Sequence, residues 1–313
     1  MSASHVGVDL GATKILARVI DPDSGRGLAR IKRPTPTGGP VAVLEAVIGL
    51  VADLDGFDRA TAVGVGVPGL VVERTVVVRC PNIPGWDSPL DVGRLLSEAL
   101  GKPVVVGNDV NCGAVAEHRL GAGSGVEDLM AVFVGTGVGG GLILGGRLID
   151  GERGLGGEIG HVTVVAGGRP CGCGGEGHLE AYAGRAGIER RARELASMGR
   201  PSKLVELAAT GGIRSRHLAI ALADGDEVAT ELVGEAVEAL ALVIGNMATM
   251  LDLRRVVLGG GVVDRLGLAF VDRIAASRSF GGFGHEMCEL SLAQRLDDAG
   301  VVGAALMAAD HFG

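Results

Sequence analysis

Short stretches in which apolar residues alternate with glycines or polar residues are separated by longer segments that have helical spacing. In the N-terminal third, this pattern predicts two strands around Gly11, followed by helices and single strands in turn. The predicted elements are a strand pair at 5–21, strands at 61–69 and 102–106, and helices at 40–54 and 88–101. Strands and helices that alternate in this way favour a sheet covered by helices, so the predicted fold class is α/β.

A second cycle begins at 129–146, where a strand, a glycine turn and another strand are predicted again. The following segment is mostly helical, and the chain then ends with two strands and a helix. The predicted helices are 179–198, 202–209, 213–222, 226–252 and about 298–311, and the predicted strands are 254–261 and 288–293. No internal repeat and no low-complexity linker marks a domain boundary, so topology has to supply it.

The composition narrows the class of protein. Hydrophobic residues make up 47% of the 313 residues and charged residues 21%, which is typical of a globular chain long enough for two domains. Aromatic residues make up only 3%, and the net charge is -8. The chain therefore lacks both the stacking platforms and the positive charge of nucleic-acid binders, and an anionic membrane is disfavoured as a partner for the same reason.

No segment predicts export or membrane insertion. The first residues reach a strand pattern without the basic and apolar regions of a signal peptide. The longest uncharged run, 129–146, contains seven glycines and predicts two strands rather than a membrane helix. Five cysteines are too few, and odd in number, for a disulfide scaffold of this length. We therefore expect a cytoplasmic enzyme.

Two glycine hairpins resemble each other. The segments 7–21 and 132–146 both place small residues and a threonine between two apolar strands. Short side chains there allow backbone N–H groups to point at a phosphate. One such hairpin is weak evidence, because glycine turns join strands in many proteins. Two of them, one in each half of the chain, suggest a clamp on a polyphosphate.

A competing nucleotide motif fails on its context. Gly135, Gly137 and Gly140 satisfy the G-x-G-x-x-G pattern of dinucleotide-binding folds. That fold requires a helix directly after the glycines, whereas the residues that follow here have strand character. A Walker A loop is also absent, because Gly101 and Lys102 are followed by Pro103.

A strand runs into a helix at Asn108 and Asp109. One interpretation is helix capping, for which both residue types are preferred. The other is catalysis, because ligands of α/β sheets bind at the carboxyl ends of strands and a carboxylate there can accept a proton from a substrate hydroxyl. The local sequence supports both interpretations equally.

The segment 169–184 is the most specific chemical signal. Cys171, Cys173 and His178 supply three metal ligands within eight residues, and His161 lies ten residues before Cys171. Four such ligands suit tetrahedral zinc, and a complete shell predicts a structural rather than a hydrolytic ion. The alternative is a pair of free thiols in a glycine loop. Zinc would also hold two flanking carboxylates in place, Glu158 and Glu180, which could otherwise be solvated surface charges.

These residues together give the chain a resemblance to the ROK family (repressors, open reading frames and sugar kinases), and within it to the bacterial glucokinases. The resemblance runs from Gly7 to about Gly303. The motifs that carry it are DLGATK (9–14), PNIPGW (81–86), the Asn108–Asp109 pair, GTGVGGG (135–141), GEIGH (157–161), CGCGGEGHLE (171–180) and VVLGGGV (256–262). Each glycine pattern is loose by itself, but their order together with the metal pattern is specific.

The chain departs from the family pattern at two positions. Ala12 replaces a common glycine and adds a methyl group at the first phosphate turn, which leaves nucleotide binding credible. His178 stands where the family usually has a third cysteine. Imidazole is a good zinc ligand, so we expect the site to persist with two cysteines and two histidines.

The resemblance implies the fold of actin-like ATPases and sugar kinases, a ribonuclease H-like α/β fold with two domains and a cleft between them. The small domain would comprise residues 1–110 and about 298–313, with the last helix crossing back to it. The large domain would comprise residues 111–297 and carry the zinc site.

The resemblance also assigns roles to individual residues. Asp9 would lie near Mg²⁺, and ATP would contact Gly11, Ala12, Thr13, Lys14, Thr136, Gly137, Gly260 and Gly261. The sugar hydroxyls would be held by Asn82, Asn108, Asp109, Glu158, His161 and Glu180. His161 would use one ring nitrogen for zinc and the other for the sugar, which sets its tautomer.

The reaction implied is in-line phosphoryl transfer from Mg-ATP to the C6 hydroxyl of D-glucose, which gives glucose 6-phosphate. Asp109 would be the general base, while Mg²⁺, backbone N–H groups and threonine hydroxyls would offset charge on the transferring group. Domain closure would exclude water, because ATP hydrolysis would otherwise compete.

Several alternatives stay open at the level of sequence. Fructose, mannose, N-acetylmannosamine or N-acetylglucosamine could replace glucose, and polyphosphate could replace ATP. A non-catalytic sugar-binding regulator is less favoured than a kinase. We do not expect a DNA-binding regulator, because Asp9 comes too early in the chain for a preceding DNA-binding module. The family further implies a homodimer.

Overall fold

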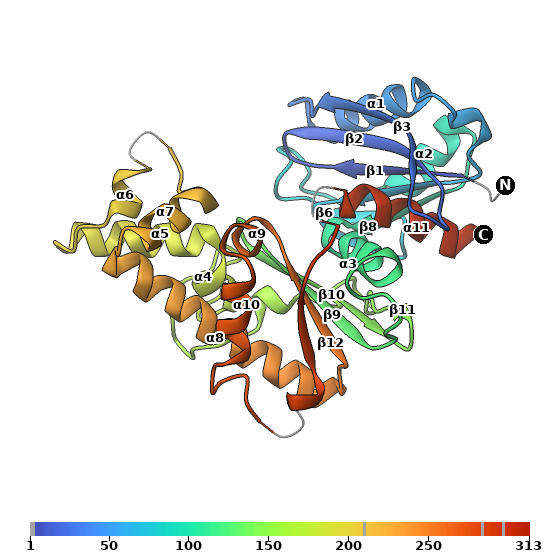
Figure 1. Cartoon of the computed structure of the whole chain (residues 1–313). Helices are drawn as coiled ribbons and strands as arrows, with labels where there is room; N and C mark the ends of the chain where they lie inside the picture. Colours follow the sequence, from blue (N-terminus) through green and yellow to red (C-terminus); the bar gives the residue numbers. More distant parts are fainter. Residues whose placement is uncertain (1–3, 209–210, 283–284, 296–297) are drawn as a thin grey trace. The chain divides into compact units, whose positions relative to one another are not determined.

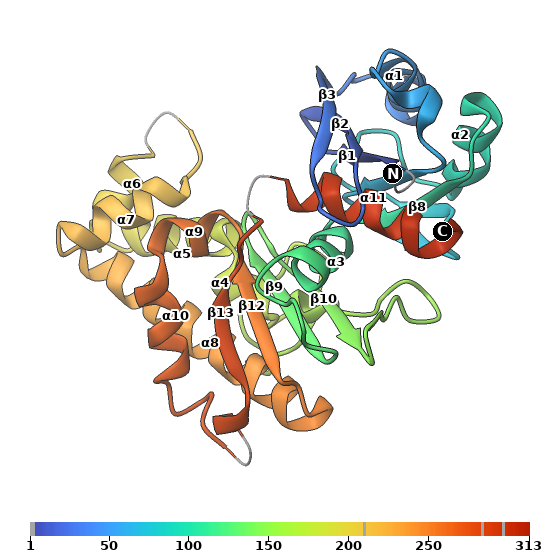
Figure 2. The same ribbon diagram turned by 45° about the vertical axis from the view of Figure 1, so that its right-hand side comes forward.

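The computed structural model describes residues 4–208, 211–282, 285–295 and 298–313 (Figures 1 and 2). The chain divides into two compact units. The first unit contains the described residues of 1–125, 141–157 and 297–313, and the second contains those of 126–140 and 158–296. These units differ from the predicted domains by including 111–125 and 141–157 with the N-terminal part, and the predicted domain limits stay a prediction.

A five-stranded sheet forms the centre of the first unit, in the order β3-β2-β1-β4-β8. Its strands are β1 (His5–Leu10), β2 (Lys14–Ile20), β3 (Gly27–Pro34), β4 (Val63–Val67) and β8 (Val104–Asn108). β1 and β2 pair antiparallel around Gly11, as predicted, and β1, β4 and β8 run parallel. The predictions missed β3, an edge strand in which inward-facing Ala29 and Ile31 alternate with exposed Arg30 and Lys32. The charged residues of this strand masked its short apolar face.

Four helices cover this sheet, and the chain's last helix is one of them (Figure 1). They are α1 (Gly39–Ala52), α2 (Val92–Leu100), α3 (Asp109–Leu120) and α11 (Ala299–Phe312). The helix α11 packs against α3, β1 and β4. A Cβ at Gly7 would lie 1.8 Å from the carbonyl oxygen of Val301, and one at Gly64 would lie 1.7 Å from that of Ala304. The glycines of β1 and β4 therefore let the backbone of α11 approach the sheet.

The second five-stranded sheet has the order β11-β10-β9-β12-β13. Its strands are β9 (Leu129–Val134), β10 (Val138–Leu144), β11 (Arg147–Leu148), β12 (Arg255–Gly259) and β13 (Glu289–Leu292). The predicted strand pair at 129–146 is confirmed as β9 and β10, and β12 runs parallel to both β9 and β13. A smaller antiparallel sheet in the first unit consists of β5 (Leu70–Val72), β6 (Val76–Arg79) and β7 (Leu90–Asp91).

The helices of the second unit match the prediction only in part, because no helix was predicted at 261–275. They are α4 (Leu179–Ala183), α5 (Arg185–Ser197), α6 (Lys203–Glu206), α7 (Ser215–Ala223), α8 (Glu227–Leu251), α9 (Gly261–Leu266) and α10 (Leu268–Ala275). The helix predicted at 179–198 is interrupted at Gly184, whose φ of -67° and ψ of 138° are extended. The strand predicted at 254–261 ends at Gly259, and α9 begins at Gly261. The last residue of the helix predicted at 202–209 lies outside the described residues.

Three 3₁₀ turns complete the described elements, at Phe57–Arg59, Ile159–His161 and His285–Met287. None of the helices in the described part of the chain combines the length and the apolar character needed to cross a membrane.

Candidate active site and metal centre

Asn108 and Asp109 stand at the junction of β8 and α3, and the structure identifies one of them as the helix cap. Asn108 is the N-cap residue: its Oδ1 accepts the N–H of Val110 at 2.9 Å and that of Asn111 at 3.2 Å. Its Nδ2 donates to the carbonyl of Gly69 at 3.1 Å. Asp109 is the first residue of α3 and is half-buried. Oδ1 of Asp109 also accepts the N–H of Val110, at 3.0 Å, so Asp109 adds a carboxylate to a helix start that Asn108 already caps.

Two cysteines near Asp109 stay protonated. Burial raises the pKa of the Cys80 thiol to about 11, and the negative charge of Asp109 adds to this rise. Burial and then the charge of Asp109 also raise the pKa of Cys112 well above its usual range. Neither thiol is therefore a thiolate at neutral pH.

The predicted sugar loop, 81–86, follows Cys80 and is anchored by two apolar side chains. Ile83 is 3% exposed and Trp86 is 1% exposed, and both belong to the core of the first unit. Asn82 is exposed. The backbone N–H groups of Asn82 and Ile83 both lower the pKa of Cys80, whose thiol also feels the charge of Asp109. Cys80 therefore lies near both the predicted sugar loop and the predicted general base.

The first glycine hairpin joins β1 and β2. The N–H of Gly11 donates to the carbonyl of Lys14 at 2.9 Å, and the hydroxyl of Thr35 donates to the carbonyl of Gly11 at 2.6 Å. Ala12 and Thr13 are exposed, so the extra methyl group of Ala12 is accommodated at the surface of the turn. The backbone of this turn is held by the protein while its side chains remain accessible.

Asp9 precedes this hairpin and is half-buried. Burial raises the pKa of its carboxyl group above 3.8, and the positive charge of Lys14 partly opposes the rise. A Cβ at Gly300 would lie 3.2 Å from the carboxyl carbon of Asp9. The carboxylate therefore lies against the first turn of α11, in an environment that disfavours its charge when no cation is present.

The second glycine hairpin joins β9 and β10 and is held from both sides. The N–H of Gly135 donates to the carbonyl of Gly137 at 2.9 Å. Oε2 of Glu180 accepts the N–H of Val138 at 3.1 Å, and the guanidinium of Arg185 donates to Oγ1 of Thr136 at 2.7 Å. A predicted sugar ligand and a residue that the sequence analysis did not single out thus contact the predicted phosphate hairpin.

The predicted adenosine motif lies between β12 and α9. Gly260 has a φ of 86°, which favours glycine, and Gly261 begins α9. Gly261 lines a cavity of about 350 Å³ together with Arg214, Ser215, Arg216, Asp264 and Arg265. This cavity is rich in positive charge, which suits a nucleotide better than a neutral ligand.

The four predicted metal ligands come together in the second unit. One donor atom each from His161, Cys171, Cys173 and His178 lies within 4.8 Å of all the others. Sγ of Cys171 lies 3.9 Å from Nδ1 of His161, and Sγ of Cys173 lies 3.2 Å from Nδ1 of His178. Zinc bonds of about 2.3 Å to sulfur and 2.0 Å to nitrogen place tetrahedral S and N ligands about 3.5 Å apart. The donor set and its spacing therefore fit a zinc ion.

Tight backbone turns position these ligands. The N–H of Cys171 donates to the carbonyl of Gly175 at 2.8 Å, and the N–H of Gly174 donates to the carbonyl of Cys171 at 3.1 Å. Burial raises the pKa of Cys171, whose side chain is mostly enclosed. A bound cation would reverse this effect, because a coordinating thiol loses its proton.

Two predicted sugar ligands lie beside the metal cluster. Nε2 of His161, the ring nitrogen that does not face Cys171, lies 3.9 Å from Oε2 of Glu158. Sγ of Cys171 lies 3.8 Å from Oε1 of Glu180. The structure therefore groups the metal ligands, Glu158, Glu180 and the second glycine hairpin within one unit. Asn82, Asn108, Asp109 and the first hairpin belong to the other unit.

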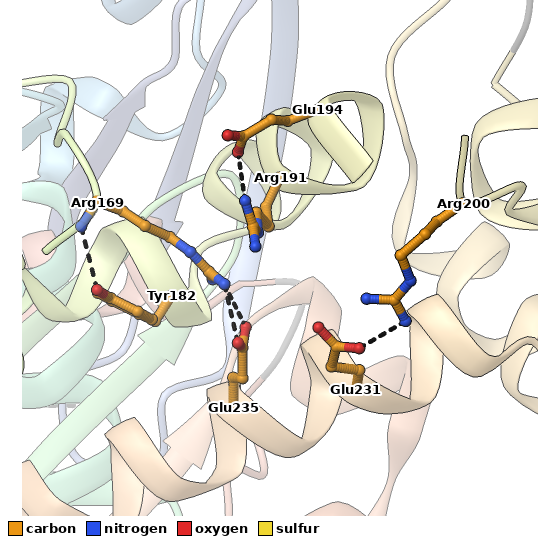
Figure 3. A network of polar contacts seen from close by, with 7 residues as sticks. All are labelled: Arg169, Tyr182, Arg191, Glu194, Arg200, Glu231 and Glu235. Atoms are coloured by element: carbon orange, nitrogen blue, oxygen red, sulfur yellow. Dashed lines mark hydrogen bonds and ion pairs between the residues drawn. The ribbon is translucent and has the colours of Figure 1, made fainter. Parts of the chain in front are cut away.

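A polar network contacts residues 169–178, which we call the metal loop (Figure 3). Arg169, two residues before Cys171, donates to both carboxylate oxygens of Glu235 in α8, at 2.9 and 2.6 Å. Its guanidinium carbon lies 4.7 Å from the ring centre of Tyr182 in α4, and its backbone N–H donates to the Tyr182 hydroxyl at 3.1 Å. Arg190 of α5 donates to the carbonyl of Pro170 at 2.5 Å. Three helices thus hold the segment that leads into the cluster.

The residues that sequence analysis missed are the arginines of this unit. Arg169 and Arg185 are separated from their partners Glu235 and Thr136 by 66 and 49 positions. A charged residue in a polar loop has many possible partners, and no local pattern identifies one of them. Arg185 carries a weak signal, since it directly follows Gly184 after the metal motif.

The chain is similar to known proteins over nearly its whole length. The model of the ROK family matches residues 5–311. A glucokinase of Streptomyces coelicolor is 34% identical over 312 residues, which cover 97% of this chain and 96% of that protein.

Two solved structures extend this similarity to three dimensions. The ROK hexokinase from Thermus thermophilus is 36% identical, has a TM-score of 0.83, and the match covers 98% of both chains. A ROK family glucokinase from Streptomyces griseus, in complex with glucose and AMPPNP, is 34% identical with a TM-score of 0.81, and the match covers 98% of this chain and 100% of that one. The predicted sugar-kinase fold is confirmed, and the chain belongs to the ROK family.

Proposed function

We propose that this chain is an ATP-dependent hexokinase that phosphorylates D-glucose at its C6 hydroxyl. The full-length similarity to glucokinases and to a glucokinase that binds glucose and AMPPNP supports this substrate pair. The observation that carries the chemistry is the position of the Asp109 carboxylate directly after β8, at a helix start whose N-cap is Asn108.

In the proposed reaction Asp109 accepts the proton of the C6 hydroxyl as that oxygen attacks the γ-phosphorus of ATP. The new P–O bond forms to the sugar, the bond from the γ-phosphorus to the bridging oxygen breaks, and ADP leaves with the electron pair. Glucose 6-phosphate is released, and Asp109 returns its proton to solvent. General-base assistance of this kind contributes about 10²–10⁴-fold.

The two glycine hairpins would bind the triphosphate. Gly11, Ala12, Thr13 and Lys14 in the first hairpin, and Thr136 and Gly137 in the second, offer N–H, hydroxyl and ammonium donors. Gly260 and Gly261 would lie against the adenosine, beside the arginine-rich cavity. Magnesium, when bound, supplies charge neutralisation at the phosphates. The half-buried Asp9 suits it, because a cation would offset the unfavourable burial of its carboxylate.

The sugar would be oriented by two groups of residues. Asn82 and Asn108 belong to the unit that carries Asp109, and Glu158, His161 and Glu180 surround the metal cluster. Carboxylates and an imidazole accept and donate hydrogen bonds to several hydroxyls at once, which suits a hexose.

Zinc would have a structural role. His161, Cys171, Cys173 and His178 form a complete four-ligand shell, which leaves no open position for a catalytic water. Nδ1 of His161 faces Cys171, so Nε2 would be left for the sugar or for Glu158. The cluster would thereby aim His161, Glu158 and Glu180 at the substrate.

A panel of sugars and phosphate donors tests the substrate assignment. Glucose, fructose, mannose, N-acetylmannosamine and N-acetylglucosamine are each supplied with ATP and with inorganic polyphosphate in a coupled assay. Glucose with ATP should give the highest kcat/KM. A preference for another sugar or for polyphosphate would show that the chain is a ROK kinase with a different substrate. No turnover with any pair would indicate a sugar-binding regulator.

Asp109→Asn tests the mechanism. It should lower kcat by about 10²–10⁴-fold, because the amide keeps the shape of the side chain but cannot accept the proton. Asp91→Asn is the matched control, since Asp91 is the N-cap residue of α2 and should affect stability only. Turnover of Asp109→Asn close to the wild-type rate would disprove the assignment. A homodimer and a cytoplasmic location stay predictions; sedimentation analysis tests the first.

A further inference from the structure

Arg185 is positioned at the second glycine hairpin by both its side chain and its backbone. It is the first residue of α5, and its guanidinium donates to Oγ1 of Thr136 at 2.7 Å and to the carbonyl of Ile213. The N–H groups of Arg185 and Ala186 donate to the carbonyls of Gly135 at 3.1 Å and Thr136 at 2.9 Å. The start of α5 and the tip of the hairpin therefore form one unit of structure.

The described part of the chain provides no ion-pair partner for Arg185, and Glu189, one turn further along α5, pairs with Arg193 instead. Among the residues that the structure places, no carboxylate forms an ion pair with this half-buried guanidinium, whose partners are a hydroxyl and a carbonyl. The first turn of α5 also contains no acidic residue. A cation at the N-terminus of a 13-residue helix faces the positive end of the helix dipole, which is unfavourable. An anion beside Arg185 would offset both charges.

The hydroxyl of Thr136 is a second hydrogen-bond donor beside Arg185. The Thr136 side chain is exposed, and its oxygen is the acceptor in the hydrogen bond with Arg185. The hydroxyl hydrogen is therefore directed to another acceptor, and the guanidinium retains N–H groups beyond the two used for Thr136 and Ile213. Phosphate oxygens match both kinds of donor, and the planar guanidinium suits them better than a lysine ammonium does.

We propose that Arg185 binds the terminal phosphates of the nucleotide together with Thr136 and offsets charge on the transferring phosphoryl group. The proposal rests on the function proposed above and adds a phosphate-binding residue outside its glycine motifs. The competing explanation is a structural clamp, in which Arg185 only ties the hairpin to the segment around Ile213. The two explanations differ in what they predict for nucleotides with and without terminal phosphates.

The test compares the affinities of AMPPNP and AMP, measured by calorimetry on the full chain. Arg185→Met should weaken AMPPNP binding by about 10-fold to 100-fold, as expected for a lost charged hydrogen bond, and change AMP binding by less than about twofold. The AMPPNP affinity of Arg185→Lys should lie between those of wild type and Arg185→Met, because lysine keeps the charge and loses the planar guanidinium. Arg193→Met is the matched control: Arg193 lies on the same helix and donates to the carbonyl of Gly211, but it does not contact the hairpin.

Two results would overturn the proposal. Unchanged AMPPNP affinity in Arg185→Met would show that the guanidinium does not contact the phosphates. An equal loss of AMPPNP and AMP affinity would identify a clamp. Should Arg185→Met fail to fold, the ratio of the two affinities is measured on Arg185→Lys, and a wild-type ratio there counts against the proposal. Failure of the wild-type chain to bind AMPPNP would overturn the proposed function as well, so the two failures are distinguishable.

Discussion

Oε2 of Glu180 accepts the backbone N–H of Val138 at 3.1 Å, which ties a residue beside the metal cluster to the second glycine hairpin. Oε1 of the same carboxylate lies 3.8 Å from Sγ of the predicted metal ligand Cys171. Glu180 thus contacts both the metal loop and the segment proposed to bind phosphate. We therefore expect a displacement of either segment to affect the other through this side chain.

The first prediction concerns the space between Glu180 and the hairpin. A Cβ at Gly137 would lie 2.0 Å from Oε2 of Glu180, so Gly137→Ala must displace either the carboxylate or the hairpin. We expect KM to rise by about 10-fold or more for both glucose and ATP, because the two proposed binding groups share this contact. Steady-state kinetics with each substrate varied in turn provide the measurement.

Gly211→Ala is the matched control for that change. A Cβ at Gly211 meets no atom of the described chain within 4 Å, and its φ is not positive. A rise of only one KM in Gly137→Ala would show that the contact does not couple the two sites.

The second prediction concerns the metal. Purified protein should contain about one zinc ion per chain, and removal by a chelator should lower Tm by about 5 °C or more, because metal binding contributes directly to folding. Cys173→Ser should reproduce the loss, while Cys288→Ala serves as a control because Cys288 lies outside the cluster. Metal-free protein with unchanged Tm and full activity would contradict the zinc assignment.

The third prediction separates two adjacent ion pairs on α8, shown in Figure 3. Glu235 accepts a hydrogen bond from Arg169 of the metal loop. Glu231, one turn earlier on α8, accepts a hydrogen bond of 2.7 Å from Arg200, which lies outside that loop. Glu235→Gln should speed zinc loss to a chromogenic chelator several-fold, because the brace on the loop is weakened. Glu231→Gln should leave this rate unchanged. Equal rates for both variants would show that the Arg169 contact does not support the cluster.

The fourth prediction concerns pH and Asp9. Burial raises the folded-state pKa of Asp9 above 3.8, so the folded chain holds this proton more tightly than the unfolded chain. The resulting stabilisation is fully present below about pH 3.8 and is lost as the pH rises through the folded-state pKa. Asp9→Asn should therefore raise Tm of the nucleotide-free protein at neutral pH, and the difference from wild type should shrink as the pH falls.

The same substitution should reduce function. Asp9→Asn removes the carboxylate proposed to hold Mg²⁺, and kcat should fall by about 10²-fold. Thermal unfolding over a pH series, with and without Mg-ATP, separates the two effects. A Tm difference that does not depend on pH would contradict the role of Asp9 burial.

Several parts of the fold were predictable because their signals are local. The pairs β1–β2 and β9–β10 follow from short apolar strands around small residues, and α8 follows from a long helical pattern with Asp226 at its N-cap. The edge strand β3 was missed because charged residues cover one of its faces. The break at Gly184 was missed because the apolar spacing continues across it, although a single extended residue ends one helix and starts the next.

The candidate site likewise has parts that local sequence predicts and parts that it does not. Local motifs singled out Asn108, Asp109 and the four predicted metal ligands, because helix capping and metal coordination require particular residue types at short spacing. The sequence left open which residue at the β8–α3 junction is the cap, and the hydrogen bonds of Asn108 decide it.

The sequence by itself predicted most strands and helices, the two glycine hairpins and the group of His161, Cys171, Cys173 and His178, since each depends on residues close to one another along the chain. Only the tertiary structure decided that Glu180 contacts Val138, that Arg185 contacts Thr136 and that Arg169 pairs with Glu235. These contacts join residues 42 to 66 positions apart. Their geometry results from how α4, α5 and α8 pack, and such packing leaves no periodic signal along the chain.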